Sequence, residues 1–353
     1  MSSSVIDHCA SIARRLCMLG LLSAACGDST ELIIVEGERI DVHHMPEFQL
    51  CGGTVEAYDR GVEFIAEQLG LDPDSLPHLT YVWLDGTTFD DPERAGRAWR
   101  DKAEAIAPFL MHEVVHMISH QEKVNANTFL TEGLATAFEE SLWEFEPIDP
   151  RPYFGARYGT SPPIDYEVAG RFVAYLLSRY GPERLWELNR DLRYLSTEGR
   201  FYRRFEAVYG EELDAVVEEY LKGECPEDAL PIPLPVSCSA EELPRASDGS
   251  WTYARTLDCA EDGVIGGIGS DYADPLMHMV TFVIDEPGFY DVRRIGDIGF
   301  GVYVYRCGGC PWLNSVKWLR SGDFEAGRYS VLIASWSELE GGSVGFTITP
   351  SED

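Results

Sequence analysis

The most constraining segment of this chain is residues 109–119, FLMHEVVHMIS, which carries no charged side chain except its own glutamate. Such a run predicts a buried helix, on which His112 and His116 lie one turn apart and can reach one metal ion. Glu113 is rotated by about a third of a turn and can reach a water on that metal without binding it. The segment is therefore either a zinc-binding helix or an ordinary buried helix with two histidines.

A third ligand decides between these interpretations, because a catalytic zinc site has three protein ligands and one open position. The metzincin pattern fails, since its glycine and histidine positions hold Ser119 and Glu122. The aspzincin element occurs as GTTFD at residues 86–90, but before the histidine motif rather than after it. The gluzincin pattern takes a glutamate from the next helix, and Glu132 in FLTEGLATAFEE stands sixteen residues after His116.

Residues 51–222 resemble the gluzincin-type bacterial metallopeptidases of the peptidase MA-like group. The resemblance rests on HExxH, the following EGLA, and YEVAGRFVAYLLSRYG with the acidic helices after it. It implies that His112, His116 and Glu132 bind zinc and that Glu113 is the general base in peptide-bond hydrolysis.

The surroundings of the third ligand both support and depart from that resemblance. Gly133 and Ala135 have small side chains that would let this helix approach the motif helix closely. Thermolysin-like members carry an aspartate one turn after the third ligand, which orients a ligand histidine. This chain departs from the pattern with Thr136 in that place, whose hydroxyl could still orient an imidazole.

The tetrahedral intermediate also needs an oxyanion donor, which family members often supply from beyond the third ligand. Tyr166, at the start of a helix after a proline-rich loop, is our first candidate, with Tyr158 and Tyr153 behind it. Each tyrosine taken singly is more often a packing residue than a catalytic one. His120 shares the motif face, but a histidine there is more often a surface or capping residue than a fourth ligand.

Apolar periodicity predicts a mainly helical region before residue 224. The expected helices are residues 54–71, 97–121 with a break at Pro108, 129–143, 166–180, 181–192 and 210–223. Residues 31–35 and 78–85 are rich in β-branched or aromatic side chains and predict strands. The proline-rich residues 144–165 predict a long loop.

The composition changes at residues 225–238, CPEDALPIPLPVSC, where four prolines predict a semi-rigid linker. Six strand-like runs follow, SWTYARTL, MHMVTFVI, GFYDVRRI, FGVYVYRC, GRYSVLIASW and SVGFTIT. Residues 241–350 resemble the pre-peptidase C-terminal-like β-sandwich of secreted bacterial proteases, which implies an accessory role. A Ca²⁺ site around Asp262, Asp271 and Asp274 is a weaker expectation there than a solvated loop.

The expected fold class is α+β, a mainly helical zincin-like catalytic domain with a small edge sheet followed by an all-β sandwich. A chain of 353 residues with 45% apolar content is long enough for two such domains. The expected boundaries are a lipoprotein-type signal peptide at 1–25, a tether with a strand at 26–50, the metallopeptidase domain at 51–224, the linker at 225–240 and the sandwich at 241–353.

The first 26 residues predict export. Arg14 and Arg15 precede ten residues that are mostly apolar, end in small side chains and are too short to span a bilayer. The sequence LLSAAC resembles a bacterial lipobox, although Ser23 stands where leucine is usual. A lipid anchor at Cys26, which would make a cell-surface or periplasmic lipoprotein, and plain secretion both stay open.

Six cysteines follow Cys26, and an even set in an exported chain predicts three disulfides. The expected pairs are Cys307 with Cys310, Cys238 with Cys259 and Cys51 with Cys225. A redox or zinc role for CGGC is less expected, because its setting is strand-like and the chain has no second CxxC.

The formal net charge of −32 argues against nucleic acid and anionic membranes as partners, because both would repel the chain. The expected function is an exported zinc-dependent peptidase that acts on a peptide or protein substrate. One alternative is a surface binding or structural lipoprotein whose metallopeptidase-like domain is a non-catalytic scaffold, although a scaffold has no need of Glu113. In another, HEVVH is merely core and binds no zinc. Cleavage specificity and oligomeric state are not predicted.

Overall fold

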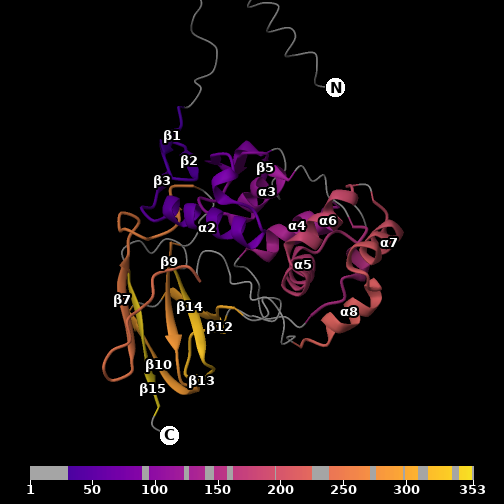
Figure 1. Ribbon diagram of the computed structural model, residues 1–353. Helices are drawn as coiled ribbons and strands as arrows, with labels where there is room; N and C mark the ends of the chain where they lie inside the picture. The colour runs from indigo at the N-terminus through magenta and orange to yellow at the C-terminus, as the bar shows by residue number, and fades with distance from the viewer. Residues whose placement is uncertain are drawn as a thin grey trace, which may run out of the picture. The chain divides into compact units, whose positions relative to one another are not determined.

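The computed structural model describes residues 31–89, 95–122, 127–139, 147–156, 162–194, 196–224, 238–270, 276–296, 299–308, 317–335 and 342–351. Residues from Ile33 onward belong to one compact unit. In this unit a region of helices and a mixed sheet is followed by antiparallel sheets, so the expected α+β class is confirmed (Figure 1). The expected signal segment lies outside the described residues, and the domain boundaries stay a prediction.

A five-stranded mixed sheet forms the first layer. Its order is β1 (Ile33–Val35), β2 (Ile40–His44), β4 (Leu79–Trp83), β6 (Lys102–Ala105) and β5 (Gly96–Trp99). The three central strands run parallel, and the outer strands pair antiparallel with their neighbours. Strand β5 is therefore an edge of the sheet among the described strands.

In the part of the chain that the structure describes, seven helices pack with this sheet around one core. They are α2 (Thr54–Gln68), α3 (Met111–Gln121), α4 (Thr128–Ala137), α5 (Tyr166–Tyr180), α6 (Pro182–Asp191), α7 (Glu198–Tyr209) and α8 (Leu213–Leu221), with short 3₁₀ turns at Pro73–Ser75, Gly86–Thr88 and Arg151–Tyr153. Helix α5 has the predicted bounds. Helix α7 was not predicted, although Phe201, Phe205 and Val208 have helical spacing and are buried.

The helix expected over residues 97–121 is wrong in its first half. Residues 96–105 form the β5–β6 hairpin, and α3 begins only at Met111. Ala103 and Ala105 alternate into the core, while Arg97 and Glu104 pair across the hairpin at 2.6 Å. Pairing with β4 therefore outweighs the helix propensity of these alanine-, lysine- and glutamate-rich residues.

The loop that leads into α3 is held by three buried aromatic side chains of α2 and β4. The bonds are Trp83 Nε1 to Ile106 O (3.0 Å), Tyr81 Oη to Ala107 O (2.7 Å), Tyr58 Oη to Pro108 O (3.4 Å) and Leu110 N to Tyr58 Oη (2.8 Å). Helix α3 has no side-chain cap of its own, so the Tyr58 hydroxyl satisfies an amide at its entry instead. This anchoring determines where α3 begins.

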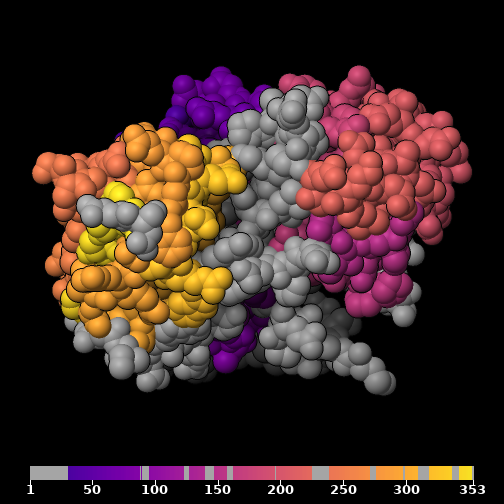
Figure 2. Space-filling model, turned by 90° about the horizontal axis from the view of Figure 1, so that it is seen from below, coloured from indigo at the N-terminus to yellow at the C-terminus, as the bar shows by residue number. Residues whose placement is uncertain are grey.

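The C-terminal residues form two antiparallel sheets with a shared core. One has the order β13 (Gly322–Phe324), β10 (Gly288–Gly296), β15 (Gly342–Pro350) and β7 (Trp251–Leu257), and the other β12 (Lys317–Trp318), β11 (Phe300–Arg306), β14 (Gly327–Ser335) and β9 (Met277–Ile284). Alternate residues such as Val331 and Ile333, and Val344 and Phe346, point into this core. In the space-filling view these strands, orange to yellow, gather into one body (Figure 2).

The two regions are bonded at the start of α2. Strand β3 (Gln49–Leu50) pairs with β8 (Gly267–Ile268), and Thr54 Oγ1 bonds the backbone N and O of Gly266 at 2.9 Å. A Cβ on Gly267 would lie 2.4 Å from the Trp83 ring and 2.9 Å from Pro108. The β8 segment therefore packs against the loop that enters α3, and glycine is needed there.

Two disulfides lie among the described residues, and they show that the expected pairing is wrong. Cys51 pairs with Cys259 and Cys238 with Cys307. Next to the β3–β8 pair, Gly52 N donates to Cys259 O at 3.1 Å, which holds Cys51 beside Cys259. Cysteine spacing does not reveal this long-range contact. Cys225 and Cys310 lie outside the described residues.

Both disulfides are expected to stabilise the fold, and the first more than the second. They span 208 and 69 residues, so the chain-entropy model makes Cys51–Cys259 more stabilising by about 1 kcal/mol. The double Cys→Ser variants, each with one bridge removed, would be compared by urea unfolding monitored by circular dichroism. An equal or reversed order would contradict this expectation.

Candidate metal centre

The two motif histidines project from the same face of α3. Their ring centroids lie 4.8 Å apart and the rings are nearly perpendicular, at 83°. His112 and His116 are each only 9% exposed, in a helix whose flanking residues Val114, Val115 and Met117 are fully buried. Packing of these apolar neighbours sets the rotation of α3 and turns both imidazoles toward α4.

Helix α4 is positioned at its start by Asn127. The Asn127 side chain accepts a hydrogen bond from Phe129 N at 3.0 Å and donates one to Phe154 O at 3.1 Å. Asparagine is a preferred N-cap because its oxygen satisfies a free amide of the first turn. The cap fixes the helix register and therefore the place of Glu132 in the second turn.

The small residue after Glu132 serves a different contact from the one expected. A Cβ on Gly133 is built 2.7 Å from Ala169 O and 2.8 Å from Val173 Cγ2, both on α5. The glycine therefore permits close packing of α4 on α5, and the expected approach to α3 is wrong for this residue. Glu132 precedes this glycine and is rotated from it by about 100° around α4, so it projects beside the α4–α5 contact and toward α3.

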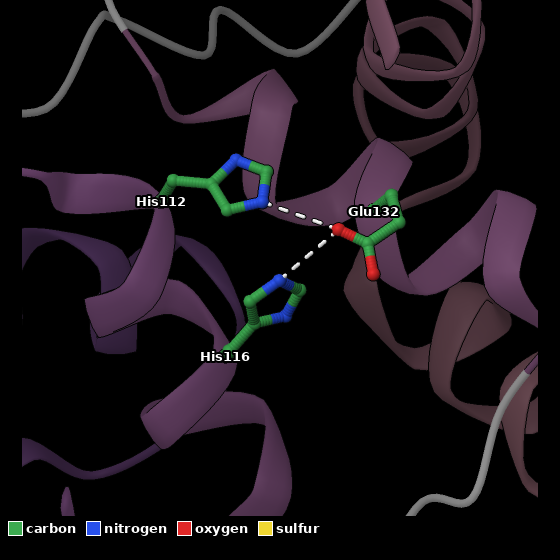
Figure 3. A group of neighbouring side chains, drawn as sticks. All are labelled: His112, His116 and Glu132. Carbon is green, nitrogen blue, oxygen red and sulfur yellow. Dashed lines mark hydrogen bonds and ion pairs between the residues drawn. The ribbon is translucent and has the colours of Figure 1, made fainter. Parts of the chain in front are cut away.

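The three predicted ligands converge on one point (Figure 3). Nε2 of His112 and Nε2 of His116 each lie 3.2 Å from Glu132 Oε2, and the three ligand atoms lie within 4.8 Å of one another. Two donors on a tetrahedral ion with bonds of about 2.0–2.1 Å are separated by about 3.4 Å. The two nitrogen-to-oxygen distances are close to this separation. Two imidazoles with one carboxylate form a donor set of catalytic zinc. This cluster can therefore hold a metal ion.

The cluster is strongly coupled electrostatically. Burial alone would lower the pKa of His112, but its bonds to Glu132 and Glu139 outweigh burial and raise the pKa to about 10. Burial alone would raise the pKa of Glu132, but bonds from both histidines hold that pKa well below its usual range. Without a metal, the carboxylate is thus balanced by imidazolium charge, which a cation would replace.

Glu113 lies beside the cluster, and one of its two carboxylate oxygens is buried. Its Oε2 has no hydrogen-bond partner among the described residues, and the side chain is 6% exposed. Burial raises the pKa of Glu113, while the charges of His116 and His112 oppose the rise. On its other side Glu113 faces β5, where a Cβ on Gly96 would lie 2.6 Å from Oε1. The carboxylate is confined between the edge strand and the cluster.

The candidate oxyanion donors and His120 differ in how close they lie to the metal cluster. Tyr166 begins α5 and its ring centroid lies 5.9 Å from that of His112, with the side chain partly exposed. Tyr153 packs against the core, and Tyr158 lies outside the described residues. His120 stacks on His116 at 6.3 Å and is not part of the three-ligand cluster.

The Thr136 hydroxyl does not orient a ligand histidine in this structure. Thr136 Oγ1 is buried with no hydrogen-bond partner among the described residues. Glu139, which the sequence analysis did not single out, lies 3.2 Å from His112 Nδ1 through its Oε2. The signal for it was a second acidic residue in FLTEGLATAFEE, seven residues or about two helical turns after Glu132, at a point where the helix was expected to continue.

The expected Ca²⁺ site is not tested. Asp271 and Asp274 lie outside the described residues, and the backbone oxygen of Asp262 accepts a hydrogen bond from Arg255. Among the described residues no helix is both long and apolar enough to cross a membrane.

The comparisons with known proteins agree with the geometry of the cluster. Residues 92–220 match the family model described as BSP, peptidase of plants and bacteria. The match covers less than half of the chain and spans α3, α4 and all three residues of the cluster. No curated protein matches the chain.

Gly96→Ala is expected to impair catalysis without removing metal. The new methyl group would meet Glu113 Oε1 and displace the carboxylate, and a shift of about 1 Å can cost up to about 100-fold in rate. Peptide hydrolysis and metal content would be measured on the same preparation. Gly86→Ala is the control, because its Cβ would meet Ile106 Cγ2 at an ordinary 3.9 Å. Parental activity in Gly96→Ala would contradict the expectation.

Proposed function

We propose that this protein is a zinc-dependent peptidase in which His112, His116 and Glu132 hold zinc and Glu113 is the general base. One observation carries the proposal: three metal-binding groups converge beside a buried carboxylate oxygen that has no partner among the described residues. The match of residues 92–220 to a peptidase family supports it independently. A non-catalytic scaffold could use the three metal ligands but would have no need of the Glu113 carboxylate.

Zinc, when bound, would polarise the scissile carbonyl and lower the pKa of a bound water to about 7. Glu113 would accept the proton of that water through Oε2 and later donate it to the leaving amine. Burial assists the second step, because the raised pKa of Glu113 favours holding the proton between the two transfers. Without metal, the charges of the two histidines limit this rise. A bound cation would act in the same direction, which favours the ionised carboxylate that the first step requires.

Strand β5 supports a peptide as the substrate. It is the last strand of its sheet among the described strands, so one side of its backbone has no strand partner there. An extended peptide can add to such an edge through main-chain hydrogen bonds. Because Gly96 of β5 lies against Glu113, a peptide bound along this edge would pass the general base. The absence of a side chain at Gly96 leaves room for the Glu113 carboxylate against this strand.

Tyr166 is our proposed donor to the tetrahedral oxyanion. Its ring lies beside His112 at the start of α5, and part of the side chain faces solvent. The Asp165 side chain caps this helix by accepting from Val168 N at 3.1 Å, which fixes the position of Tyr166. A phenolic hydroxyl at the mouth of the site suits a donor that acts only when substrate is bound.

Export is part of the same proposal. Two disulfides among the described residues are typical of proteins that fold in an oxidising compartment. The lipid anchor at Cys26 is proposed from the lipobox-like sequence. The β-sandwich would be an accessory domain whose β8 segment also packs beside the entry to α3.

Two substitutions separate the proposed base from the proposed ligand. Glu132→Ala should lose most of the zinc and the activity, because a two-histidine site is much weaker than a three-ligand site. Glu113→Gln should keep near-stoichiometric zinc and lose catalysis by roughly 10²-fold or more, because an amide cannot accept the proton. Zinc would be measured by mass spectrometry of the dialysed protein, and hydrolysis with a peptide library.

Circular dichroism would establish that both variants are folded. Full zinc in Glu132→Ala would refute the ligand assignment. Parental hydrolysis by Glu113→Gln would refute the mechanism. Zinc binding by the parent with no hydrolysis of any peptide would favour the scaffold alternative.

Tyr166→Phe should lower kcat by about 10²-fold, as expected for the loss of one oxyanion donor, and leave zinc content unchanged. Tyr153→Phe is the matched control, because that ring packs against the core and should affect kcat by no more than about twofold. Single-turnover hydrolysis would measure both. Equal effects of the two substitutions would remove Tyr166 from the mechanism.

A further inference from the structure

The second nitrogen of His112 faces a carboxylate that has no part in metal ligation. Glu139 Oε2 lies 3.2 Å from His112 Nδ1, while Nε2 of the same ring faces Glu132 Oε2, also at 3.2 Å. A neutral imidazole has one N–H donor and one acceptor nitrogen. If Nδ1 donates to Glu139, the lone pair lies on Nε2, which is the nitrogen that points to the metal position.

The local fold explains how Glu139 reaches this ring. Helix α4 ends at Ala137, Phe138 is fully buried as its C-cap, and the Glu139 amide bonds to Thr136 O at 3.1 Å. The Glu139 side chain is 30% exposed, against 11% for His112. A side chain just past the helix end can fold back toward α3 while keeping contact with water.

Thr136 cannot take this role in the observed packing. Its methyl group faces α5, where a Cβ on Gly170 would lie 2.7 Å from Thr136 Cγ2. Its hydroxyl is buried and without a partner among the described residues, although Thr136 stands one turn after Glu132. The close packing of α4 on α5 therefore holds Thr136, one turn after Glu132, away from the histidines. Glu139, about one turn further along the chain, is the carboxylate that meets His112 Nδ1.

We propose that Glu139 is a positioning residue of the metal centre, which accepts the His112 Nδ1–H bond and holds Nε2 toward the metal. This inference rests on the proposed function, because it assumes that His112 is a ligand. A carboxylate partner on the far nitrogen fixes the ring orientation and increases the basicity of the ligating nitrogen. Glu139 touches neither substrate nor metal, so its effect should appear first in metal affinity.

Glu139→Ala should weaken zinc binding by about 10- to 100-fold, which is the usual effect of losing such a partner. Glu139→Gln keeps an acceptor oxygen and should lose less than about tenfold. The matched control is Glu122→Gln at the end of α3, where a carboxylate of similar exposure, 28%, pairs with Arg190 instead of a histidine. The control should stay within about twofold. Competition with a chromophoric chelator would measure all four proteins.

A second readout separates orientation from general stability. In the zinc-loaded parent, the His112 Nδ1 proton should give a resolved signal that exchanges slowly with water, assigned by long-range ¹H–¹⁵N correlation. Glu139→Ala should broaden or abolish this signal, and Glu122→Gln should retain it. Should Glu139→Ala fail to fold, the smaller affinity loss and faster proton exchange expected of Glu139→Gln decide the matter.

The outcomes distinguish this role from the proposed function. A parent chain that binds no zinc overturns both. A parent that binds zinc, together with unchanged affinity and an unchanged Nδ1 proton in both Glu139 variants, overturns only the positioning role. Equal losses of affinity in the Glu139 variants and in Glu122→Gln also overturn it, because they would show a general effect of removing acidic charge.

Discussion

The structure depends on one buried contact, the Glu132 carboxylate shared between the two histidines of α3. An unpaired charge in this setting would cost several kcal/mol, so α3 and α4 are stable together only if the carboxylate meets the imidazoles or a metal ion. The Asn127 cap sets the register of α4, and Gly133 lets α4 pack closely on α5 while the neighbouring Glu132 projects toward α3. The same geometry that satisfies the buried charge also assembles a three-donor metal site.

The second requirement is the position of α3, and distant parts of the chain supply it. Tyr58 of α2 and Trp83 of β4 bond the backbone of the loop before α3, and Gly267 of β8 packs against Trp83 and Pro108. Strand β5, at the edge of the sheet, then packs against Glu113 through Gly96. The motif helix is therefore positioned by the sheet, by α2 and by the start of the C-terminal region, and not by its own capping residues.

Features with a local cause could be predicted from the sequence. The spacing of His112 and His116, the helix containing Glu132 and the bounds of α5 each follow from neighbouring residues. Features decided by distant pairing were missed: the β5–β6 hairpin depends on β4, and the Cys51–Cys259 disulfide on the β3–β8 pair. The contact of Glu139, rather than Thr136, with His112 was missed for a similar reason. Only the packing of α4 against α5 shows where the Thr136 side chain points.

The central claim is that one zinc ion binds between α3 and α4, and a crystal structure of the zinc-loaded chain with anomalous data at the zinc edge tests it most directly. We predict one strong peak at about 2.0–2.2 Å from Nε2 of His112, Nε2 of His116 and a carboxylate oxygen of Glu132. Glu113 should lie near the peak without being a direct ligand. No peak at this position, or a zinc ion bound by other residues, would contradict the account.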